Sequence, residues 1–145
     1  MSRAAIVTRE ISPALLIAEV KSPEFGAISV FAGTVRETND GRSVSAIDYS
    51  AYTLMAEAEL ERILAETAEE FGVSAIVVEH RVGPLALGDV SVAIVAAHAH
   101  RAPALDATRF VIEEIKKRVP IWKREHYADG SREWVDPTQA TGVAR

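Results

Sequence analysis

Two lysines on either side of a proline are the side chains of this chain best suited to chemistry. Lys116 lies near the end of a helical pattern, and Lys123 lies on the basic strand Ile121-Trp122-Lys123-Arg124-Glu125 that follows Pro120. Because proline cannot continue a helix, the chain turns there, and we expect the two amines to converge. Neighbouring ammonium groups disfavour each other's charge, and a lysine brought towards neutrality can act as an acid, a base or a nucleophile. Two solvated lysines that never meet are the common alternative, which spacing alone does not exclude.

A second cationic group stands at the start of the same helix. His100-Arg101 comes immediately before Ala102-Pro103, where the free amides and the dipole of a helix N-terminus favour an anion. Arg36 ends an earlier strand and could join them, since two guanidinium groups and a helix end suit a phosphate. Three ordinary surface charges are the competing interpretation, and spacing supports both equally.

The histidines also admit a metal site. His98 and His100 lie on one face of a strand end, and His80 could supply a third ligand. No HExxH or comparable frame accompanies them, so we expect no metal and no other cofactor.

Composition narrows the possible functions. The 145 residues include no cysteine, which excludes a cysteine nucleophile and thiolate metal sites, so any sulfur chemistry must use sulfur brought by a partner. The net charge of −5 argues against broad nucleic-acid binding. Glutamates crowd residues 57–70 and basic residues crowd 101–132, which indicates one basic locality and a small anionic ligand.

The length fits one domain, with residues 1–136 as a single catalytic domain and 137–145 as a flexible tail. No apolar stretch reaches the ~18 residues of a membrane span, and the N-terminus lacks a signal-peptide pattern. We therefore expect a cytoplasmic protein that binds no membrane.

Two long helices should position the lysines. Residues 54–71 form an amphipathic pattern that Gly72 ends, and residues 103–119 form another. Apolar residues at steps of three and four predict the buried faces, which are Leu60, Ile63, Leu64, Thr67 and Phe71 in the first helix and Leu105, Thr108, Ile112, Ile115 and Val119 in the second. Lys116 would lie on the border of the second face, while Lys117 would point away from it.

Strands are expected at residues 4–9, 26–36, 44–52, 74–82, 90–99, 121–125 and 133–135. We expect 44–52 to pair back on 26–36 as a hairpin, because the turn Asp40-Gly41 lies between them. The order of strands and helices predicts an α+β sandwich with a mostly antiparallel sheet.

Several segments, in order, carry a family resemblance. The most specific are GAISVFAGTVR at 26–36 and VPIWKRE at 119–125. The others are Tyr49-x-x-Tyr52-x-x-Met55-Ala56, His80-Arg81-Val82-Gly83, His100-Arg101, Ile115-Lys116, Asp129-Gly130 and Trp134-Val135. They span residues 3–136, and together they resemble the large, catalytic subunit of molybdopterin synthase.

The resemblance implies an α/β hammerhead fold and a homodimer at the core of a heterotetramer. Each large subunit would bind a small ubiquitin-like sulfur carrier, whose C-terminal Gly-Gly enters the pocket as a thiocarboxylate. The implied reaction converts cyclic pyranopterin monophosphate to molybdopterin by two sulfur insertions that form the dithiolene, a step of molybdenum cofactor biosynthesis.

The resemblance also implies roles for individual residues. Lys116 would be the principal catalytic lysine, and Lys123 would assist by proton transfer or charge stabilisation, both in contact with substrate. The other substrate-binding residues would be Thr34 and Val35 lining the site, Arg36, His100 and Arg101 holding the phosphate, and Arg124 and Glu125 completing the wall.

One segment departs from the family pattern. The family often carries an arginine shortly after the Trp-Val pair, reaching into the neighbouring subunit's pocket, but here Asp136-Pro137-Thr138 occupies that stretch. Arg132 or Arg145 is a candidate substitute.

Two other classes of function stay open. One is a non-catalytic protein whose lysines hold the acidic tail of a partner. The other is a metal-dependent hydrolase built on His80, His98 and His100, which stoichiometric zinc in the purified protein would support.

Overall fold

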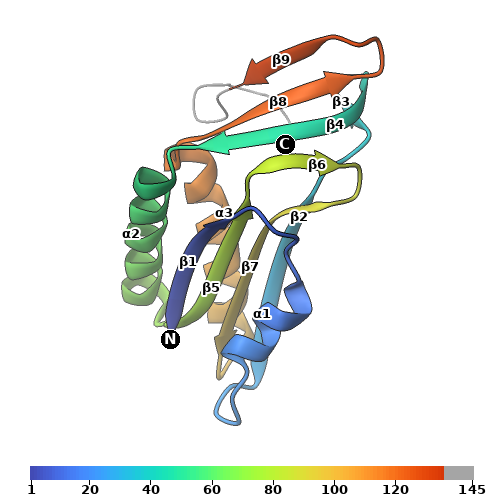
Figure 1. Ribbon diagram of the computed structural model, residues 1–145. Coiled ribbons are helices and arrows are strands. Elements are labelled where there is room, and N and C mark those ends of the chain that lie inside the picture. Colours follow the sequence, from blue (N-terminus) through green and yellow to red (C-terminus); the bar gives the residue numbers. More distant parts are fainter. Residues whose placement is uncertain (136–145) are drawn as a thin grey trace.

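The chain forms two sheets, with helices packed on one of them (Figure 1). The computed structural model describes residues 1–135, so the predicted tail at 137–145, the stretch Asp136-Pro137-Thr138 and Arg145 lie outside the described residues. In chain order the elements are β1 (Ser2–Val7), α1 (Pro13–Val20), β2 (Ala27–Thr34), β3 (Thr38–Asn39), β4 (Arg42–Ala51), α2 (Thr53–Phe71), β5 (Ala75–Arg81), β6 (Gly83–Ala86), β7 (Val90–His98), α3 (Arg101–Arg118), β8 (Ile121–Tyr127) and β9 (Arg132–Val135).

The first sheet and its helices form a unit that we call the handle. Its strand order is β1-β5-β7-β2, with β1 parallel to β5 and the other neighbours antiparallel. Helices α2 and α3 cover one face and α1 covers the other (Figure 1). β5 and β7 are buried along almost their whole length, which explains their nearly continuous apolar sequences.

The second sheet, which we call the head, lies across one end of the handle (Figure 1). It has the order β3-β4-β8-β9, β6 also pairs with β4, and all of these pairings are antiparallel. The predicted α+β class with mostly antiparallel sheets is confirmed.

The predicted hairpin between 26–36 and 44–52 is wrong. β2 pairs with β7, whereas β4 pairs with β6 and β8 in the other sheet. The turn at Asp40 and Gly41 does exist, with φ values of 50° and 75°, but it joins β4 to the two-residue strand β3. The residues between β2 and β3 carry the chain from the handle to the head.

The buried face of α3 overlaps the predicted one but is turned away from Leu105. Thr108, Ile115 and Val119 are buried as predicted, whereas Leu105 is 57% exposed and Ile112 is half-buried. Ala104, Ala107 and Val111 complete the buried face instead. One flank of α3 faces α2, where Arg118 binds Glu59. The opposite flank carries Ile112 and Lys116 to a cavity that Gly33 and Thr34 of β2 also line, and helical spacing puts Leu105 on that flank as well.

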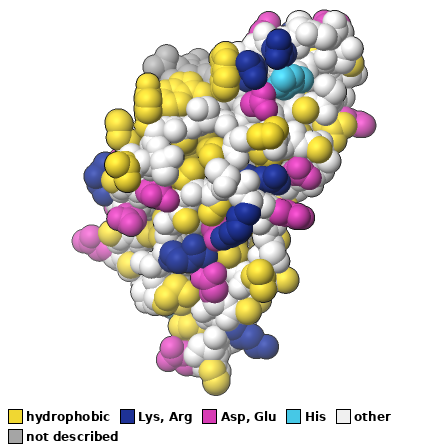
Figure 2. All heavy atoms as spheres, viewed as in Figure 1, with side chains coloured by type: hydrophobic (Ala, Val, Ile, Leu, Met, Phe, Trp, Pro, Cys, Tyr) yellow, Lys and Arg dark blue, Asp and Glu magenta, His cyan; other side chains and the backbone are white. Residues whose placement is uncertain are grey.

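The surface seen in Figure 2 mixes charges of both signs. Lys and Arg side chains lie beside Asp and Glu there, so among the described residues this face offers no broad basic surface for a nucleic-acid backbone. Over residues 1–135, none of the helices is both long and apolar enough to cross a membrane.

A buried carboxylate anchors the N-terminal strand. Glu79 on β5 is 0% exposed and accepts hydrogen bonds from Arg3 at 3.0 Å and from Arg9 at 2.6 and 3.0 Å. Burial by itself would raise the pKa of Glu79, but the hydrogen bonds and charges of Arg9 and Arg3 outweigh it and hold the pKa below its ordinary value. The carboxylate is therefore ionised in the folded chain at neutral pH.

Helix α2 follows the predicted pattern closely. It begins at Thr53, one residue before the predicted start, with Tyr52 as the N-cap residue, and it ends at Gly72, which has a φ of 68°. Its fully or nearly fully buried residues are Ala56, Leu60, Ile63, Leu64 and Thr67.

We expect Leu60→Ala to lower the free energy of unfolding by about 2–5 kcal/mol, because it opens a cavity beneath a fully buried side chain. Leu54→Ala in the same helix is the matched control, since Leu54 is 84% exposed, and it should change that free energy by no more than about 0.5 kcal/mol. Urea unfolding measures both values. Equal losses would contradict the orientation of α2.

We expect Glu79 to make stability depend on pH. In the unfolded chain a glutamate binds its proton at a pKa of about 4.3, whereas the folded chain keeps Glu79 ionised to lower pH. Unfolding therefore takes up a proton in this window, and the stabilisation present above about pH 5 is lost as the pH falls through the lowered folded-state pKa.

The variant Glu79→Gln tests this dependence. It should lower the free energy of unfolding at pH 7 by about 1–3 kcal/mol and flatten its decline in acid, because the titrating group is gone. Urea unfolding at several pH values measures both effects. An acid decline as steep as that of the unaltered chain would assign the dependence to other carboxylates.

Candidate functional site

A small cavity lies where the handle meets the head, at the C-terminal end of α3. Its volume is about 90 Å³, and one helix, several strands and the Val119 corner form its wall. The lining residues are Phe31, Gly33, Thr34, Tyr49, His80, Ser91, Val92, Ile112, Ile115, Lys116, Val119, Ile121 and Lys123. Lys116 and Lys123, which we expected to converge, therefore line one cavity. Their catalytic role stays a prediction.

The two lysines reach the cavity from different elements. Lys116 is half-buried and projects from the flank of α3 that faces β2. Lys123 belongs to β8, where Ile121, Lys123, Glu125 and Tyr127 alternate as buried residues with half-buried neighbours. This alternation is the period of two that places the four side chains on one face of the strand.

Lys123 forms a buried ion pair with Glu125. Lys123 is 3% exposed and Glu125 is 1% exposed, and the Lys123 Nζ lies 2.9 Å from Oε1 of Glu125. The sequence interpretation set the two lysines only against each other, whereas the structure gives Lys123 a carboxylate neighbour. Such a pair is tolerated inside a protein only when further hydrogen bonds satisfy its remaining polar atoms.

Asn39 and Arg36 supply the next links. Asn39 donates from Nδ2 to both oxygens of Glu125, at 2.8 and 2.9 Å, and its Oδ1 accepts from Nη2 of Arg36 at 3.3 Å. A continuous series of polar contacts thus runs from Arg36 through Asn39 and Glu125 to Lys123. Asn39 was absent from the sequence-based site, because nothing in its local pattern distinguishes it from any residue before an Asp-Gly turn.

The surroundings keep Glu125 ionised. Burial would raise its pKa, but the hydrogen bonds from Lys123 and Asn39 and the charge of Lys123 hold the pKa of Glu125 below its ordinary value. Tyr127 responds in the opposite sense, since burial and then its hydrogen bond to Glu125 raise the pKa of Tyr127 to about 12. At neutral pH the head therefore holds a carboxylate and a neutral phenol side by side.

Two aromatic residues complete the polar wall of the cavity. Tyr49 lies directly opposite Lys123 in the β4–β8 ladder, and its ring meets that of His80 edge-on at 5.1 Å between centroids. Nδ1 of His80 lies 2.9 Å from the carbonyl oxygen of Arg81. Because a carbonyl only accepts, Nδ1 carries the proton in that contact. The sequence offered His80 only as a metal ligand, and its place beside the lysines follows from strand pairing.

The strand β2 contributes through small residues. Thr34 and Gly33 line the cavity, and a Cβ added at Gly33 would lie 2.9 Å from Cγ1 of Val92. Val35, predicted to line the site, is instead 4% exposed and packs in the apolar core of the head.

Arg124 lies on the opposite face of β8 from Lys123. Its Nη2 donates to Oδ2 of Asp48 at 2.9 Å, and its guanidinium carbon lies 4.9 Å from the centroid of the Trp134 ring. Within one chain, then, Arg124 does not line the cavity, whereas Glu125 reaches it through Lys123.

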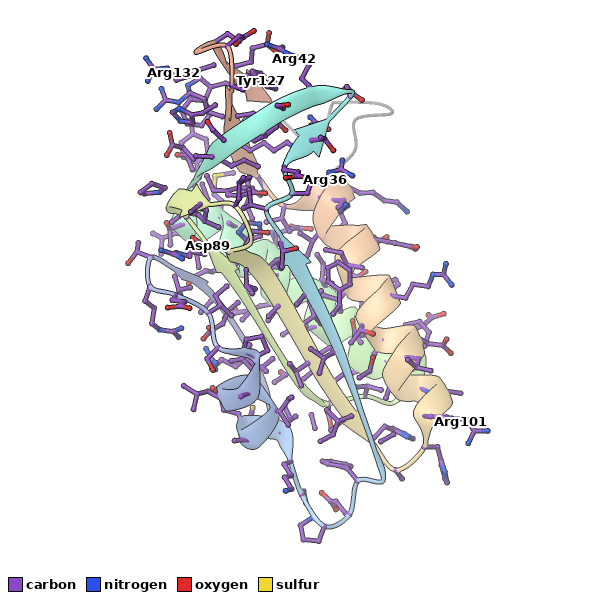
Figure 3. The ribbon with its side chains drawn as sticks, turned by 90° about the vertical axis from the view of Figure 1, so that its right-hand side faces the viewer. Arg36, Arg42, Asp89, Arg101, Tyr127 and Arg132 are labelled. Carbon is purple, nitrogen blue, oxygen red and sulfur yellow. The ribbon has the colours of Figure 1, made fainter. Side chains whose placement is uncertain are left out.

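His100 and Arg101 lie at the far end of α3 from the lysines. Fifteen residues separate Arg101 from Lys116, which corresponds to about 22 Å at 1.5 Å per residue. Figure 3 shows Arg101 at one end of the helix and Arg36 near the other. A single chain therefore does not bring the two arginines into one phosphate site, because α3 holds them apart.

The three histidines considered as an alternative metal site do not come together within one chain. His98 and His100 are neighbours, with 6.0 Å between ring centroids, and they line the end of the handle, whereas His80 lines the cavity. In the described part of the chain, no group of three or more His, Asp or Glu side chains is placed to hold a metal ion.

Comparison with known proteins identifies the family of the chain. The family model "MoaE protein" matches residues 6–118. The molybdopterin synthase catalytic subunit of Thermoplasma volcanium is 40% identical over 89% of this chain and 94% of its own length. That of Halalkalibacterium halodurans is 41% identical over 92% of this chain and 85% of its own length.

Solved structures give the same result. Molybdopterin synthase from Staphylococcus aureus superposes with a TM-score of 0.85 at 36% identity, covering 90% of this chain and 95% of that one. A complex of subunits 1 and 2 of molybdopterin-converting factor from Helicobacter pylori superposes with a TM-score of 0.75 over 91% of this chain and 89% of that one. At 23% identity, this second likeness concerns the fold alone. The family model, the relatives and the fold together show that the chain belongs to the MoaE protein family.

Proposed function

We propose that the chain transfers sulfur from a thiocarboxylated small carrier protein to cyclic pyranopterin monophosphate, as the catalytic subunit of molybdopterin synthase. The observation that carries the proposal is the convergence of Lys116 and Lys123 on one cavity in a member of this family. A chain without cysteine has no sulfur nucleophile of its own, which fits sulfur delivered by a partner. A cytoplasmic location and a single catalytic domain over residues 1–136 are part of the same proposal.

The two lysines have different surroundings and hence different proposed roles. Lys116 stands on the flank of α3 at the cavity wall, where its ammonium group can stabilise negative charge that develops as the carrier's thiocarboxylate reacts. Lys123 is held by Glu125, which suits it to exchanging a proton with the substrate side of the cavity. Each transfer forms a carbon–sulfur bond at a carbon of the pterin side chain as a carbon–oxygen bond at the same carbon breaks. Water then hydrolyses the carbon–sulfur bond to the carrier, which supplies the new oxygen of the carrier's carboxylate and leaves the sulfur on the pterin.

The phosphate of the substrate needs cations beyond the two lysines. Arg36 is placed to supply one, because it lines a second small hollow together with Thr34, Asn39 and Lys123. His100 and Arg101 are too far away in the same chain, so we propose that they act on the cavity of a second copy.

Pairing of two copies through β2 would produce this arrangement. β2 is an end strand of the handle, and on it Ile28 is 38% and Val30 is 42% exposed. Leu105, on the flank of α3 that faces the same edge, is 57% exposed. Antiparallel pairing of β2 with its copy would bury these residues and join the handles into one sheet.

Such a two-fold arrangement reverses the partner's α3. The two α3 helices then run antiparallel on the same face of the joined sheet, so the N-terminal end of one approaches the C-terminal end of the other. The partner subunit's His100 and the partner subunit's Arg101 would reach the end of α3 that carries Lys116. A homodimer would thus assemble the phosphate site that one chain leaves divided.

The small carrier is the other proposed partner. The Helicobacter pylori structure that shares this fold is a complex of two subunits of a molybdopterin-converting factor. By analogy, each copy of the chain would bind one ubiquitin-like carrier, whose Gly-Gly end is narrow enough to enter a cavity lined by Gly33.

We expect Lys116→Ala to reduce dithiolene formation by about 10²-fold or more, because it removes the principal cation of the cavity. The assay combines the chain with thiocarboxylated carrier and the cyclic pterin. Lys117→Ala is the matched control, since Lys117 is 70% exposed and pairs with Glu114, and its rate should stay within about twofold of the unaltered chain. Unimpaired turnover by Lys116→Ala would favour the non-catalytic binding protein instead.

We expect mixed dimers to show whether Arg101 acts across the interface. Lys116→Ala and Arg101→Ala chains are each impaired alone, but a mixed dimer would contain one site with both residues intact. Random exchange of subunits should therefore restore roughly a quarter of the unaltered activity, because about half of the dimers are mixed and each has one good site. The measurement is activity before and after the two variants are mixed and allowed to exchange. If both residues belong to the site of one chain, mixing restores nothing.

A further inference from the structure

We propose that Asn39 is a positioning residue that couples phosphate binding at Arg36 to the Lys123–Glu125 ion pair. The inference rests on the proposed function for the identity of the phosphate ester, but its geometry stands on the contacts of a single chain. No residue of the sequence-based site linked the anion-binding arginine to the catalytic lysines.

Asn39 is held where it can serve both sides. It is 8% exposed, and β3 pairs it with Arg42 immediately before the tight turn at Asp40 and Gly41. The turn fixes its backbone, so the side chain enters the hollow that Arg36, Lys123 and Glu125 also line. The amide is therefore placed by the fold rather than by free rotation at the surface.

The chemistry of the contacts requires an amide. Its NH₂ group donates to both oxygens of Glu125, and its oxygen accepts from Arg36. An aspartate at this place would put a second carboxylate against Glu125, and an alanine would leave Glu125 with one donor fewer. The planar amide moves as a unit, so a shift at its oxygen is also a shift at its nitrogen.

This geometry links substrate binding to the amine. A phosphate that accepts from Nη2 of Arg36 takes the N–H that the oxygen of Asn39 accepts in the single chain. When the amide oxygen loses that donor, the hydrogen bonds from the NH₂ group to Glu125 change. The ion pair between Glu125 and Lys123 then changes as well. The phosphate of the substrate thereby sets the position of a catalytic side chain that it does not touch.

The first test observes Glu125 directly and needs no catalysis. Inorganic phosphate serves as the probe, and the ¹³C resonance of the Glu125 carboxyl group is the readout. In the unaltered chain phosphate should move this resonance, and in Asn39→Ala the movement should fall several-fold. Ser43→Ala is the matched control, because Ser43 lies on the same hairpin with an exposed side chain, and it should respond like the unaltered chain.

The titration of the same resonance gives a second readout. Losing the Asn39 donor should raise the pH at which Glu125 takes up its proton, because that donor helps to keep the carboxylate ionised. The charged or titratable groups that face Glu125, directly or through one neighbour, are Arg36, Arg42, Lys123, Tyr127 and Glu133. All of them remain in Asn39→Ala, so the change reports the amide.

The third test uses activity. If Asn39 and Arg36 act in series, Asn39→Ala and Arg36→Ala should each lower kcat/KM by about tenfold, and the double variant should be little worse than the poorer single one. Asn39→Asp preserves the shape of the side chain but not its NH₂ donor, so it should be impaired like Asn39→Ala. If Asn39 acted only by filling space, Asn39→Asp would keep its activity.

The outcomes separate the coupling through Asn39 from the proposed function. A Glu125 resonance that ignores phosphate, or responds equally in Asn39→Ala, overturns the coupling whatever the enzyme does. Additive losses in kcat/KM overturn it as well. An unaltered chain that forms no dithiolene with thiocarboxylated carrier overturns the proposed function, while the resonance data still decide the coupling.

Discussion

The site depends on one buried ion pair, between Lys123 and Glu125, at the junction of the handle and the head. Two charges at 3% and 1% exposure are costly to remove from water, and removing one partner of such a pair typically costs about 3–5 kcal/mol. The head offsets that cost with a complete set of polar partners, since Asn39 and Tyr127 both bind the carboxylate. The hydrogen bonds from Asn39 to Glu125 hold β3 against β8, and the pair gives the junction a charged wall.

The rest of the fold can be understood as support for that junction. The handle supplies rigid strands buried on both faces, and α3 brings Lys116 to the end of the sheet where the head begins. The buried face of α3 packs on the sheet through Ala104, Ala107 and Val111, which leaves the flank with Ile112 and Lys116 at the cavity. One chain thus builds the amine side of the site, and in the proposed dimer a second copy supplies the cations of the opposite helix end.

Short-range sequence patterns predicted part of the fold. The order of elements, the end of α2 at Gly72 and the alternation along β8 all follow from short-range patterns. What failed depends on contacts between distant segments. The strands that pair with β4 depend on which of the two sheets it joins. The buried face of α3 depends on how the helix packs against the sheet.

The site residues show the same difference between short-range and long-range contacts. The convergence of Lys116 and Lys123 was expected from a helix, a proline and a strand that are adjacent in sequence. Asn39 lies 86 residues from Glu125, and no spacing rule reaches that far. His100 and Arg101 were grouped with Arg36 on chemical type alone, and the length of α3 separates them.

The parallel pairing of β1 with β5 has a consequence for synthesis on the ribosome. Arg3 finds Glu79 across 76 residues, so β1 leaves the exit tunnel well before its partner β5 and must wait for it. Contacts of such long range are slow to form because the intervening chain has to close a large loop. β1 is therefore one of the later strands to settle although it is made before β5, and during that interval its apolar side chains are available to chaperones.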